Sequence, residues 1–349
     1  MSDLIEKVKK TINNNNLIIP GDRVVLAVSG GPDSICMLDV LYKIYCQTNP
    51  EPMAILPNKP GTDGNIFAVA HINHMIRKEA GEDEAFVRDY CKKLGIEFYS
   101  KSIDVQKIAN TNKIGLEEAG RVARYDFFDE VAKKFGANKI AIAHNKNDSV
   151  ETVIMHALRG SGTNGLEGIQ PKNGKYIRPL IDCERTEIEQ YCKDNSIDAR
   201  IDKTNLENVY TRNKIRNLVI PYIKEEFNPN IIETITRLSS LIKEENDYID
   251  NQVKKLFKEI VVTEDLENSC IILDLKQFNL QEKVIKSRLV LYTINRLFGT
   301  TKGIEKIHIE DIIKLCQNNI GNKYLTPNKN IKVLVKNGKV QFSYIKIAN

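Results

Sequence analysis

The chain has 349 residues, of which 42% are hydrophobic and 28% charged, and 51 basic against 46 acidic side chains give a net charge of +5. This length predicts two or three domains, and the composition excludes a collagen, a fully disordered chain and a disulfide scaffold. No apolar run approaches the roughly 20 residues that span a bilayer, and the seven cysteines are dispersed without a CxxC pair. We therefore expect reduced thiols, a cytoplasmic location and no membrane partner.

Strands and helices alternate over the first 158 residues. The run Arg23–Val28 is apolar and β-branched, which is typical of a strand buried on both faces. The expected strands are 23–28, 66–72, 96–105 and 139–143, and the expected helices are 3–12, 34–45, 82–94, 116–135 and 149–158, with a loop at 48–65. Such alternation requires parallel strands joined by helical crossovers. We predict an α/β fold with an open, mostly parallel sheet, helices on both faces, and ligands at the carboxyl ends of the strands.

The pattern changes after Pro229. We expect helices over 231–257, 281–298 and 305–316, then strands over 331–335 and 339–345. The Asn337-Gly338 dipeptide between these strands is a strong hairpin signal. Because Pro221 and Pro229 interrupt the helical pattern, we place a domain boundary near 222–229. The prediction is a domain of residues 1–221 and a smaller, mainly helical domain of residues 222–349 that ends in a β-hairpin.

The last 27 residues are strongly basic. Residues 323–349 contain six lysines and no acid. Such a segment suits a phosphate backbone, but lysine also protects the edges of ordinary sheets from aggregation. Both interpretations remain open at this point.

A glycine-rich turn follows the first strand and leads into a helix. It consists of Ser29, Gly30, Gly31, Pro32, Asp33 and Ser34. Two glycines let the backbone approach an anion closely, and a helix N-terminus offers N–H groups and a positive dipole. Asp33 suggests a Mg²⁺ ion that bridges to phosphates. The turn matches neither GxxxxGK[ST] nor GxGxxG, and a purely structural helix cap is the alternative.

Titratable side chains follow two further strands. His71 and Asn73 end the second strand, where packing near a nucleotide is more plausible than metal binding. Asp148 and Glu151 share one helix face after the fourth strand, and such a pair holds either Mg²⁺ or an ammonium group. Compensation of the helix dipole is the alternative. His144 precedes them and is a candidate proton acceptor near neutral pH.

Arginines recur near the same predicted sheet edge. They are Arg121, Arg124, Arg159, Arg178, Arg212 and Arg216. Arginine forks suit phosphates, although surface solvation explains any single one. Their number favours a polyanionic substrate.

Several blocks resemble one known family. Ser29–Ser34 is similar to the SGGxDS signature of the PP-loop ATP pyrophosphatases, which cleave ATP between the α and β phosphates. Within that superfamily, six further blocks look like the tRNA(Ile)-lysidine synthases. They are His71–His74 with Arg77, Glu117–Tyr125, Ala143–Thr152, Leu158–Gly168, Arg178–Leu180 and Asp202–Arg216.

The resemblance implies a two-step reaction. ATP adenylates O2 of the wobble cytidine in the CAU anticodon of tRNA(Ile), and the amine of free L-lysine then attacks C2 and displaces AMP. The implied cofactors are ATP and Mg²⁺, and the implied partners are this tRNA and L-lysine, with homodimer formation left open. The implied catalytic residues are Asp33, His144, Asp148, Glu151 and Arg212. ATP would contact Ser29, Gly30, Gly31, Pro32, Asp33, Ser34, His71 and Asn73. Mg²⁺ would contact Asp33 and Asp148, and RNA would contact Arg77, Arg121, Arg124, Arg159, Arg178 and Arg216.

The sequence departs from the family pattern at two positions beside Asp148. Asn147 stands where the family usually has an aspartate, and Ser149 where it often has a glutamine. Longer family members also carry an extra C-terminal domain. Two alternatives follow, namely another PP-loop tRNA-modifying enzyme such as a thiolase, against which the missing CxxC argues, and a catalytically inactive tRNA-binding protein.

Overall fold

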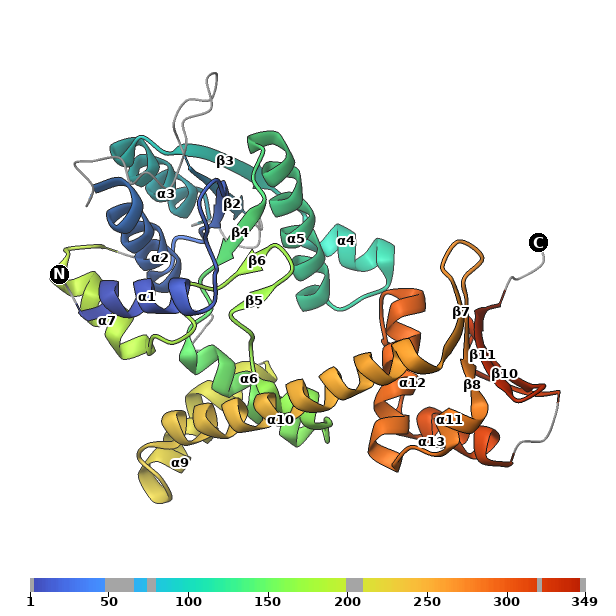
Figure 1. The fold of residues 1–349 in the computed structure, drawn as a ribbon. Coiled ribbons are helices and arrows are strands. Elements are labelled where there is room, and N and C mark those ends of the chain that lie inside the picture. The colour runs from blue at the N-terminus through green and yellow to red at the C-terminus, as the bar shows by residue number, and fades with distance from the viewer. Residues whose placement is uncertain (1–2, 48–65, 74–79, 199–209, 319–321, 346–349) are drawn as a thin grey trace. The chain divides into compact units, whose positions relative to one another are not determined.

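The computed structural model describes residues 3–47, 66–73, 80–198, 210–318 and 322–345. The chain forms two compact units, residues 1–240 and 241–349 (Figure 1). Their division lies inside the long helix α10 (Ile231–Ile260), and the functional domains 1–221 and 222–349 stay a prediction. The expected loop 48–65 lies outside the described residues. No helix in the described part of the chain is long and apolar enough to cross a membrane.

The first unit is built on a six-stranded sheet in the order β3-β2-β1-β4-β6-β5. Its strands are β1 (Val24–Ala27), β2 (Phe67–Asn73), β3 (Glu97–Ser102), β4 (Lys139–Ile142), β5 (Lys172–Asn173) and β6 (Tyr176–Ile177). The strands β3, β2, β1, β4 and β6 run parallel, and β5 joins the edge antiparallel. The predicted open, mostly parallel sheet is confirmed.

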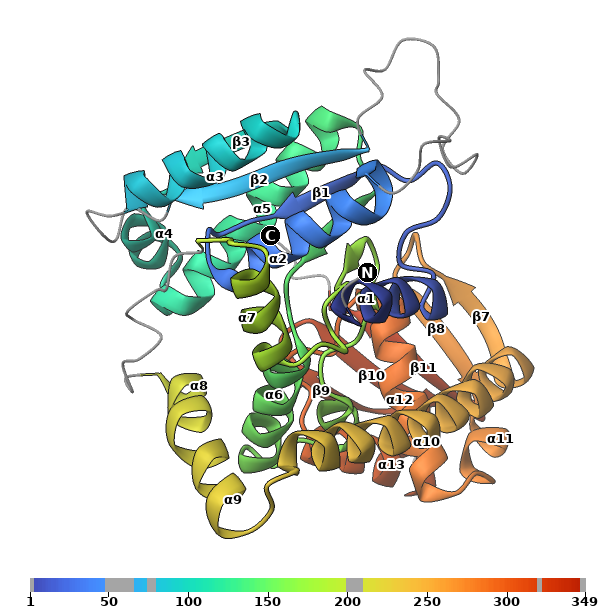
Figure 2. The same cartoon turned by 90° about the vertical axis from the view of Figure 1, so that its left-hand side faces the viewer.

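Helices cover both faces of this sheet, as predicted (Figure 2). In β1, Val24 and Leu26 pack in one core with α1, α2, α3 and α7, whereas Val25 packs in another with α5. The helices of this unit are α1 (Asp3–Asn14), α2 (Pro32–Tyr42), α3 (Ala80–Leu94), α4 (Val105–Asn112), α5 (Leu116–Phe135), α6 (Lys146–Leu158), α7 (Arg185–Asp194), α8 (Thr211–Lys214) and α9 (Ile220–Glu226). Short π-helical or 3-10 segments are η1 (Lys43–Gln47), η2 (Thr163–Glu167) and η4 (Ile215–Val219).

Side-chain caps explain where elements differ from the sequence prediction. Helix α6 begins at Lys146 rather than Ser149, because Asn145 and Asp148 form a capping box. The third strand ends at Ser102 rather than residue 105, because Asp104 caps the unpredicted helix α4. Helix α7 was also not predicted.

The second unit contains a five-stranded antiparallel sheet in the order β7-β8-β11-β10-β9. Its strands are β7 (Val261–Asp265), β8 (Cys270–Asp274), β9 (Lys323–Asn328), β10 (Ile331–Lys336) and β11 (Lys339–Tyr344), and its helices include α11 (Leu275–Asn279), α12 (Lys283–Phe298) and α13 (Lys306–Asn318). The predicted hairpin is confirmed, with Asn337 at φ 51° and Gly338 at φ 69°. The sequence analysis missed β7, β8 and β9.

A buried carboxylate supports α2, the helix that follows the glycine-rich turn. Asp39 accepts hydrogen bonds from the hydroxyls of Tyr90 (2.9 Å) and Tyr191 (2.6 Å), and Lys43 Nζ lies 2.7 Å from its Oδ2. Asp39 is only 7% exposed, so removing it leaves these donors without their acceptor.

We predict that Asp39→Ala costs about 3–5 kcal/mol of unfolding free energy, because it breaks a buried charged network. Tyr90→Phe should cost about 1 kcal/mol, since it removes one hydrogen bond. Urea unfolding measures both, and a cost below that of Tyr90→Phe for Asp39→Ala would contradict the role of this network.

Candidate active site

The glycine-rich turn lies at the carboxyl end of β1 and opens α2. Gly30 has φ +95°, which favours glycine. Ser34 Oγ closes the turn, because it donates to Gly31 O (2.9 Å) and accepts from Ser29 N (3.1 Å). Pro32 takes the first helical position, where its missing N–H costs nothing. The turn thus leads into the N-terminus of α2, and helix N-termini suit anions.

His71 is a buried side chain that contacts the residue just before this turn. It is 2% exposed, and its Nδ1 lies 2.9 Å from Val28 O. Burial lowers the pKa of its ring, so the neutral imidazole donates from Nδ1 to the last residue before the turn. Asn73 ends the same strand, and Arg77 lies outside the described residues.

Two carboxylates form the centre of a charged cluster at the start of α6. Glu151 is 1% exposed, and it pairs with Arg212 Nε at 2.9 Å and Arg216 Nε at 2.6 Å. Asp148 Oδ1 lies 3.2 Å from Arg212 Nη2 and 2.9 Å from Arg216 Nη2. Burial by itself would raise the pKa of Asp148. Opposing effects, of which the positive charge of Arg212 is the largest, lower that pKa below its usual value. Asp148 is therefore held as an anion.

A third arginine, which the sequence analysis missed, completes this cluster. Arg185 opens α7, and its Nη2 lies 3.3 Å from Asp148 Oδ1. Its backbone N–H donates to Asn147 Oδ1 at 3.0 Å. The side chain of Asn147 thus connects the start of α6 to the first residue of α7 and keeps Arg185 beside Asp148, a contact that an aspartate oxygen could also accept. The helical spacing of Ile188, Tyr191 and Cys192, which α7 buries, was the available sequence signal for this helix.

Asp33 lies in the first turn of α2 and is electrostatically coupled to this cluster. Burial, followed by the negative charge of Asp148, raises the pKa of Asp33 to about 6. Asn145 lies nearby, and its amide interacts favourably with ionised Asp33. The Nδ2 atom of Asn145 is buried and has no ordinary hydrogen-bond partner in the described part of the chain. The site therefore places an amide donor beside two acids that repel each other.

His144 is not suited to take a proton near neutral pH. Burial lowers its pKa to about 4, although the charge of Asp148 opposes this. Arg178 Nε–H donates to His144 Nδ1 at 3.2 Å, so the neutral ring carries its proton on Nε2. His144 is thus a hydrogen-bond donor at pH 7, in contrast to the proton acceptor expected from sequence.

The remaining predicted arginines have different environments. Arg178 is 8% exposed and donates to Gln170 O at 2.7 Å. Arg121 and Arg124 are exposed on α5, and Arg159 is exposed at the end of α6. The positive charges of Arg178 and Arg124 both lower the pKa of His144, so these two lie within electrostatic reach of the site.

A loop after α6 packs tightly against that helix. Ser149 Oγ accepts from Ile169 N at 2.9 Å, and His156 Nδ1 lies 2.7 Å from Gly165 O. A Cβ atom at Gly168 would lie 2.3 Å from Ser149 Oγ. The departure at Ser149 is therefore explained by packing, since a small hydroxyl fits under Gly168.

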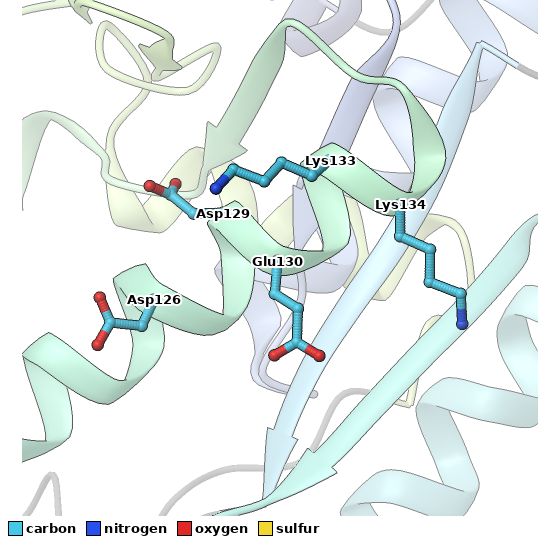
Figure 3. Close-up of a pocket in the computed structure, with 5 residues that line it drawn as sticks. All are labelled: Asp126, Asp129, Glu130, Lys133 and Lys134. Atoms are coloured by element: carbon cyan, nitrogen blue, oxygen red, sulfur yellow. The ribbon is translucent and has the colours of Figure 1, made fainter.

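A separate surface hollow lies on α5, lined by charged side chains of that single helix (Figure 3). The lining residues are Asp126, Asp129, Glu130, Lys133 and Lys134. Asp129 pairs with Lys175 at 2.9 Å, and Glu130 with Lys101 at 2.6 Å. These are ordinary exposed ion pairs, and none of the predicted site residues lines the hollow.

We predict that Asp33→Asn stabilises the ligand-free protein at pH 7.5. The carboxyl has a pKa of about 6 when folded and about 3.9 when unfolded. Between these values the folded state binds more protons, so wild-type stability falls as pH rises. The gain should be about 1–3 kcal/mol at pH 7.5 and vanish near pH 4.

Urea unfolding at both pH values measures this gain. Asp126→Asn, on the exposed face of α5, is the matched control and should change little. Destabilisation by Asp33→Asn at pH 7.5 would disprove the electrostatic strain at Asp33.

We also predict that Gly168→Ala costs about 1–3 kcal/mol more than Gly174→Ala, because a methyl group is forced against Ser149. Both glycines have positive φ, and nothing lies within 4 Å of a Cβ at Gly174. Gly168 also has ψ −159°, a backbone conformation that glycine alone adopts readily, so backbone strain adds to its cost. Equal unfolding midpoints of the two variants would argue against tight packing of this loop.

Comparisons with known proteins identify the family of this chain. A family model described as a PP-loop domain matches residues 1–223. The tRNA(Ile)-lysidine synthase of Clostridium tetani is 41% identical over 98% of this chain and 69% of its own length, and that of Clostridioides difficile 42% identical over 99% and 72%. A U34-tRNA thiolase structure from Methanococcus maripaludis shares the fold, with a TM-score of 0.54 and 19% identity over 69% of this chain and 79% of its own. The chain belongs to the tRNA(Ile)-lysidine synthase family.

Proposed function

We propose that this chain joins free L-lysine to C2 of the wobble cytidine in the CAU anticodon of tRNA(Ile), at the expense of ATP. The proposal rests on the proximity of the PP loop, residues Ser29–Ser34, to the cluster of carboxylates and arginines at the start of α6. Asp33 in the loop and Asp148 in the cluster are close enough for the charge of one to raise the pKa of the other. An anion site and a cation site thus adjoin, as the joining of a nucleotide and an amine requires.

The first step is adenylation of cytidine O2. C2 of cytosine is a poor electrophile until this oxygen becomes a good leaving group. The N-terminus of α2 would hold the phosphates, and the unpartnered Asn145 Nδ2 is available to a nucleotide oxygen. Nε2–H of His144 would donate to the oxygens that gain charge in this step.

The acids of the site also fit Mg²⁺. A magnesium ion is commonly bound by one or two carboxylates and by substrate phosphates, and a cation between Asp33 and Asp148 would relieve their repulsion. No group of three or more acid, histidine or cysteine ligands was found among the described residues, which is consistent with an ion held mainly by phosphates. Bound there, Mg²⁺ would neutralise charge on the departing pyrophosphate.

The second step is attack of the lysine amine on C2, with loss of AMP. Asp148 and Glu151 would hold the ammonium group that does not react, and Arg212, which contacts both carboxylates, holds them in place. A covalent enzyme intermediate is not needed, because the adenylated cytidine is itself the activated species.

Basic side chains supply candidate tRNA contacts in each unit. In the first unit these are the predicted arginines, of which Arg121, Arg124 and Arg159 are exposed. In the second unit, Lys332 and Lys336 alternate along β10 with the buried Val333 and Val335. Lys332 Nζ lies 4.4 Å from the centre of the Tyr324 ring, and such lysine–aromatic surfaces suit nucleic acids. Homodimer formation stays a prediction.

The proposal predicts that Asp33→Ala and Glu151→Gln each lower lysidine formation at least about 100-fold, because each removes charge from the reacting centre. Incubation with ATP, L-lysine and a CAU tRNA(Ile) transcript, followed by mass spectrometry of the nucleosides, measures the product. Asp126→Ala is the control and should keep full activity.

The same assay separates the alternatives. Full activity of both site variants would refute these roles. If the wild type forms no lysidine and releases no pyrophosphate, the result would favour an inactive tRNA-binding protein. Transfer of labelled sulfur to tRNA would favour a thiolase.

A further inference from the structure

Resting on the proposed function, we propose that Arg185 binds the two outer phosphates of ATP and in doing so withdraws from Asp148, which opens the carboxylate pair to the amine substrate. Arg185 would then couple the binding of ATP to the binding of lysine. Two separate observations carry the proposal, namely the lack of a cation in the PP loop and the loose pairing of Arg185.

The PP loop has no cationic side chain of its own. Residues Ser29–Ser34 include neither lysine nor arginine, yet the pyrophosphate unit of ATP carries several negative charges. Backbone N–H groups and a helix dipole compensate only part of that charge. A cationic side chain from a neighbouring element would stabilise the part of this charge that Mg²⁺ does not neutralise.

Helix α7 is that neighbour. It packs against α2 through a hydrogen bond from Tyr191 Oη to Asp39 Oδ2 (2.6 Å), and Cys192 Sγ lies 3.8 Å from Pro32 O in the loop itself. Arg185 is the first residue of α7. Burial and the charge of Asp148 raise the pKa of Asp33, and the positive charge of Arg185 is the largest of the effects that oppose them. The guanidinium of Arg185 is thus close to the first turn of α2.

Arg185 is the most weakly held of the three arginines. Its nearest contacts to the carboxylates are 3.3 Å to Asp148 and 3.6 Å to Glu151. The corresponding shortest contacts are 2.9 Å for Arg212 and 2.6 Å for Arg216. A guanidinium has five N–H donors, and for Arg185 one side-chain hydrogen bond is recorded in the described structure. Its side chain is also 22% exposed, so it has both donors and room for a phosphate.

The backbone of Arg185 is nevertheless fixed, because its N–H donates to Asn147 Oδ1 at 3.0 Å. The side chain can therefore turn from the carboxylates towards the phosphates while α7 stays in place. Removal of one of three positive charges from Asp148 and Glu151 favours a new cation there. An ammonium group would bind better after ATP than before it, and by linkage ATP would bind better with lysine present.

Arg185→Ala tests the phosphate contact. We expect the KM for ATP to rise about 10–100-fold, since an arginine–phosphate contact of ordinary strength is lost, while the KM for lysine does not rise. Arg185→Lys should give an intermediate rise, because a point charge replaces a fork. Lys193→Ala, an exposed cation on the same helix, is the control and should leave both constants unchanged.

Calorimetry tests the coupling without catalysis. With α,β-methylene ATP, which cannot be cleaved at the reacting bond, the wild type should bind lysine more tightly than without it, and Arg185→Ala should bind lysine equally in both states. The analogue itself should bind the variant more weakly. This readout stands even if the wild type forms no lysidine, a result that would overturn the proposed function alone.

Three outcomes would overturn the inference. A rise in the KM for lysine with no change for ATP would make Arg185 a ligand for the lysine carboxylate. No change in either constant would leave it a structural ion-pair partner. If Arg185→Ala does not fold, the same comparison is made with Arg185→Lys, and normal ATP affinity in that variant would contradict the need for a guanidinium fork.

Discussion

The active site depends on the burial of two carboxylates, Asp148 and Glu151, on the first turns of one helix. Buried anions are costly unless they are paired and hydrogen-bonded, and here the partners come from α7, α8 and η4. The capping box of Asn145 further holds Asp148 at the helix start. The cluster therefore joins segments that lie up to 68 residues apart in the sequence. Because all three arginines contact both carboxylates, loss of one carboxylate would leave the three positive charges to share a single anion.

The buried charge of Asp148 also destabilises ionised Asp33 in the ligand-free site. The charge of Asp148 and the burial of Asp33 together keep Asp33 at a pKa near the working pH, which disfavours the ligand-free protein. Phosphates and a cation would relieve that repulsion. Part of the free energy of ATP binding can thus be used to offset the repulsion between Asp33 and Asp148. Burial likewise keeps the ring of His144 neutral, and the donation of Arg178 Nε–H to its Nδ1 leaves the ring proton on Nε2.

The fold was largely predictable, because its signals are local. The apolar run of β1, the glycine turn and the Asn337-Gly338 hairpin each appear within a few consecutive residues. Ligands of parallel sheets bind at the carboxyl ends of the strands. The region of the site could therefore be predicted from the end of β1, which pairs with both β2 and β4. Boundaries that depend on a side-chain cap, such as the start of α6 at Lys146, were missed because capping competes with the hydrophobic pattern that the analysis followed.

The arginine partners were only partly predictable. The family resemblance suggested Arg212 and Arg216, but their contacts with Glu151 arise from tertiary packing that no spacing indicates. Arg185 was missed because its helix was missed. Asn147 and Ser149 were departures from the family pattern in the sequence, and the structure gives each a hydrogen-bond partner, Arg185 N and Ile169 N. Departures from a family pattern thus acquire meaning only with their contacts.

The central claim is that the site activates the tRNA before it uses the amine. Rapid-quench analysis with ATP labelled in its α phosphate tests this most directly. The account predicts that tRNA(Ile) becomes labelled and pyrophosphate is released before lysine is added, and that lysine then discharges the label as AMP. Pyrophosphate release that requires lysine, with label on the amino acid and none on the tRNA, would contradict it.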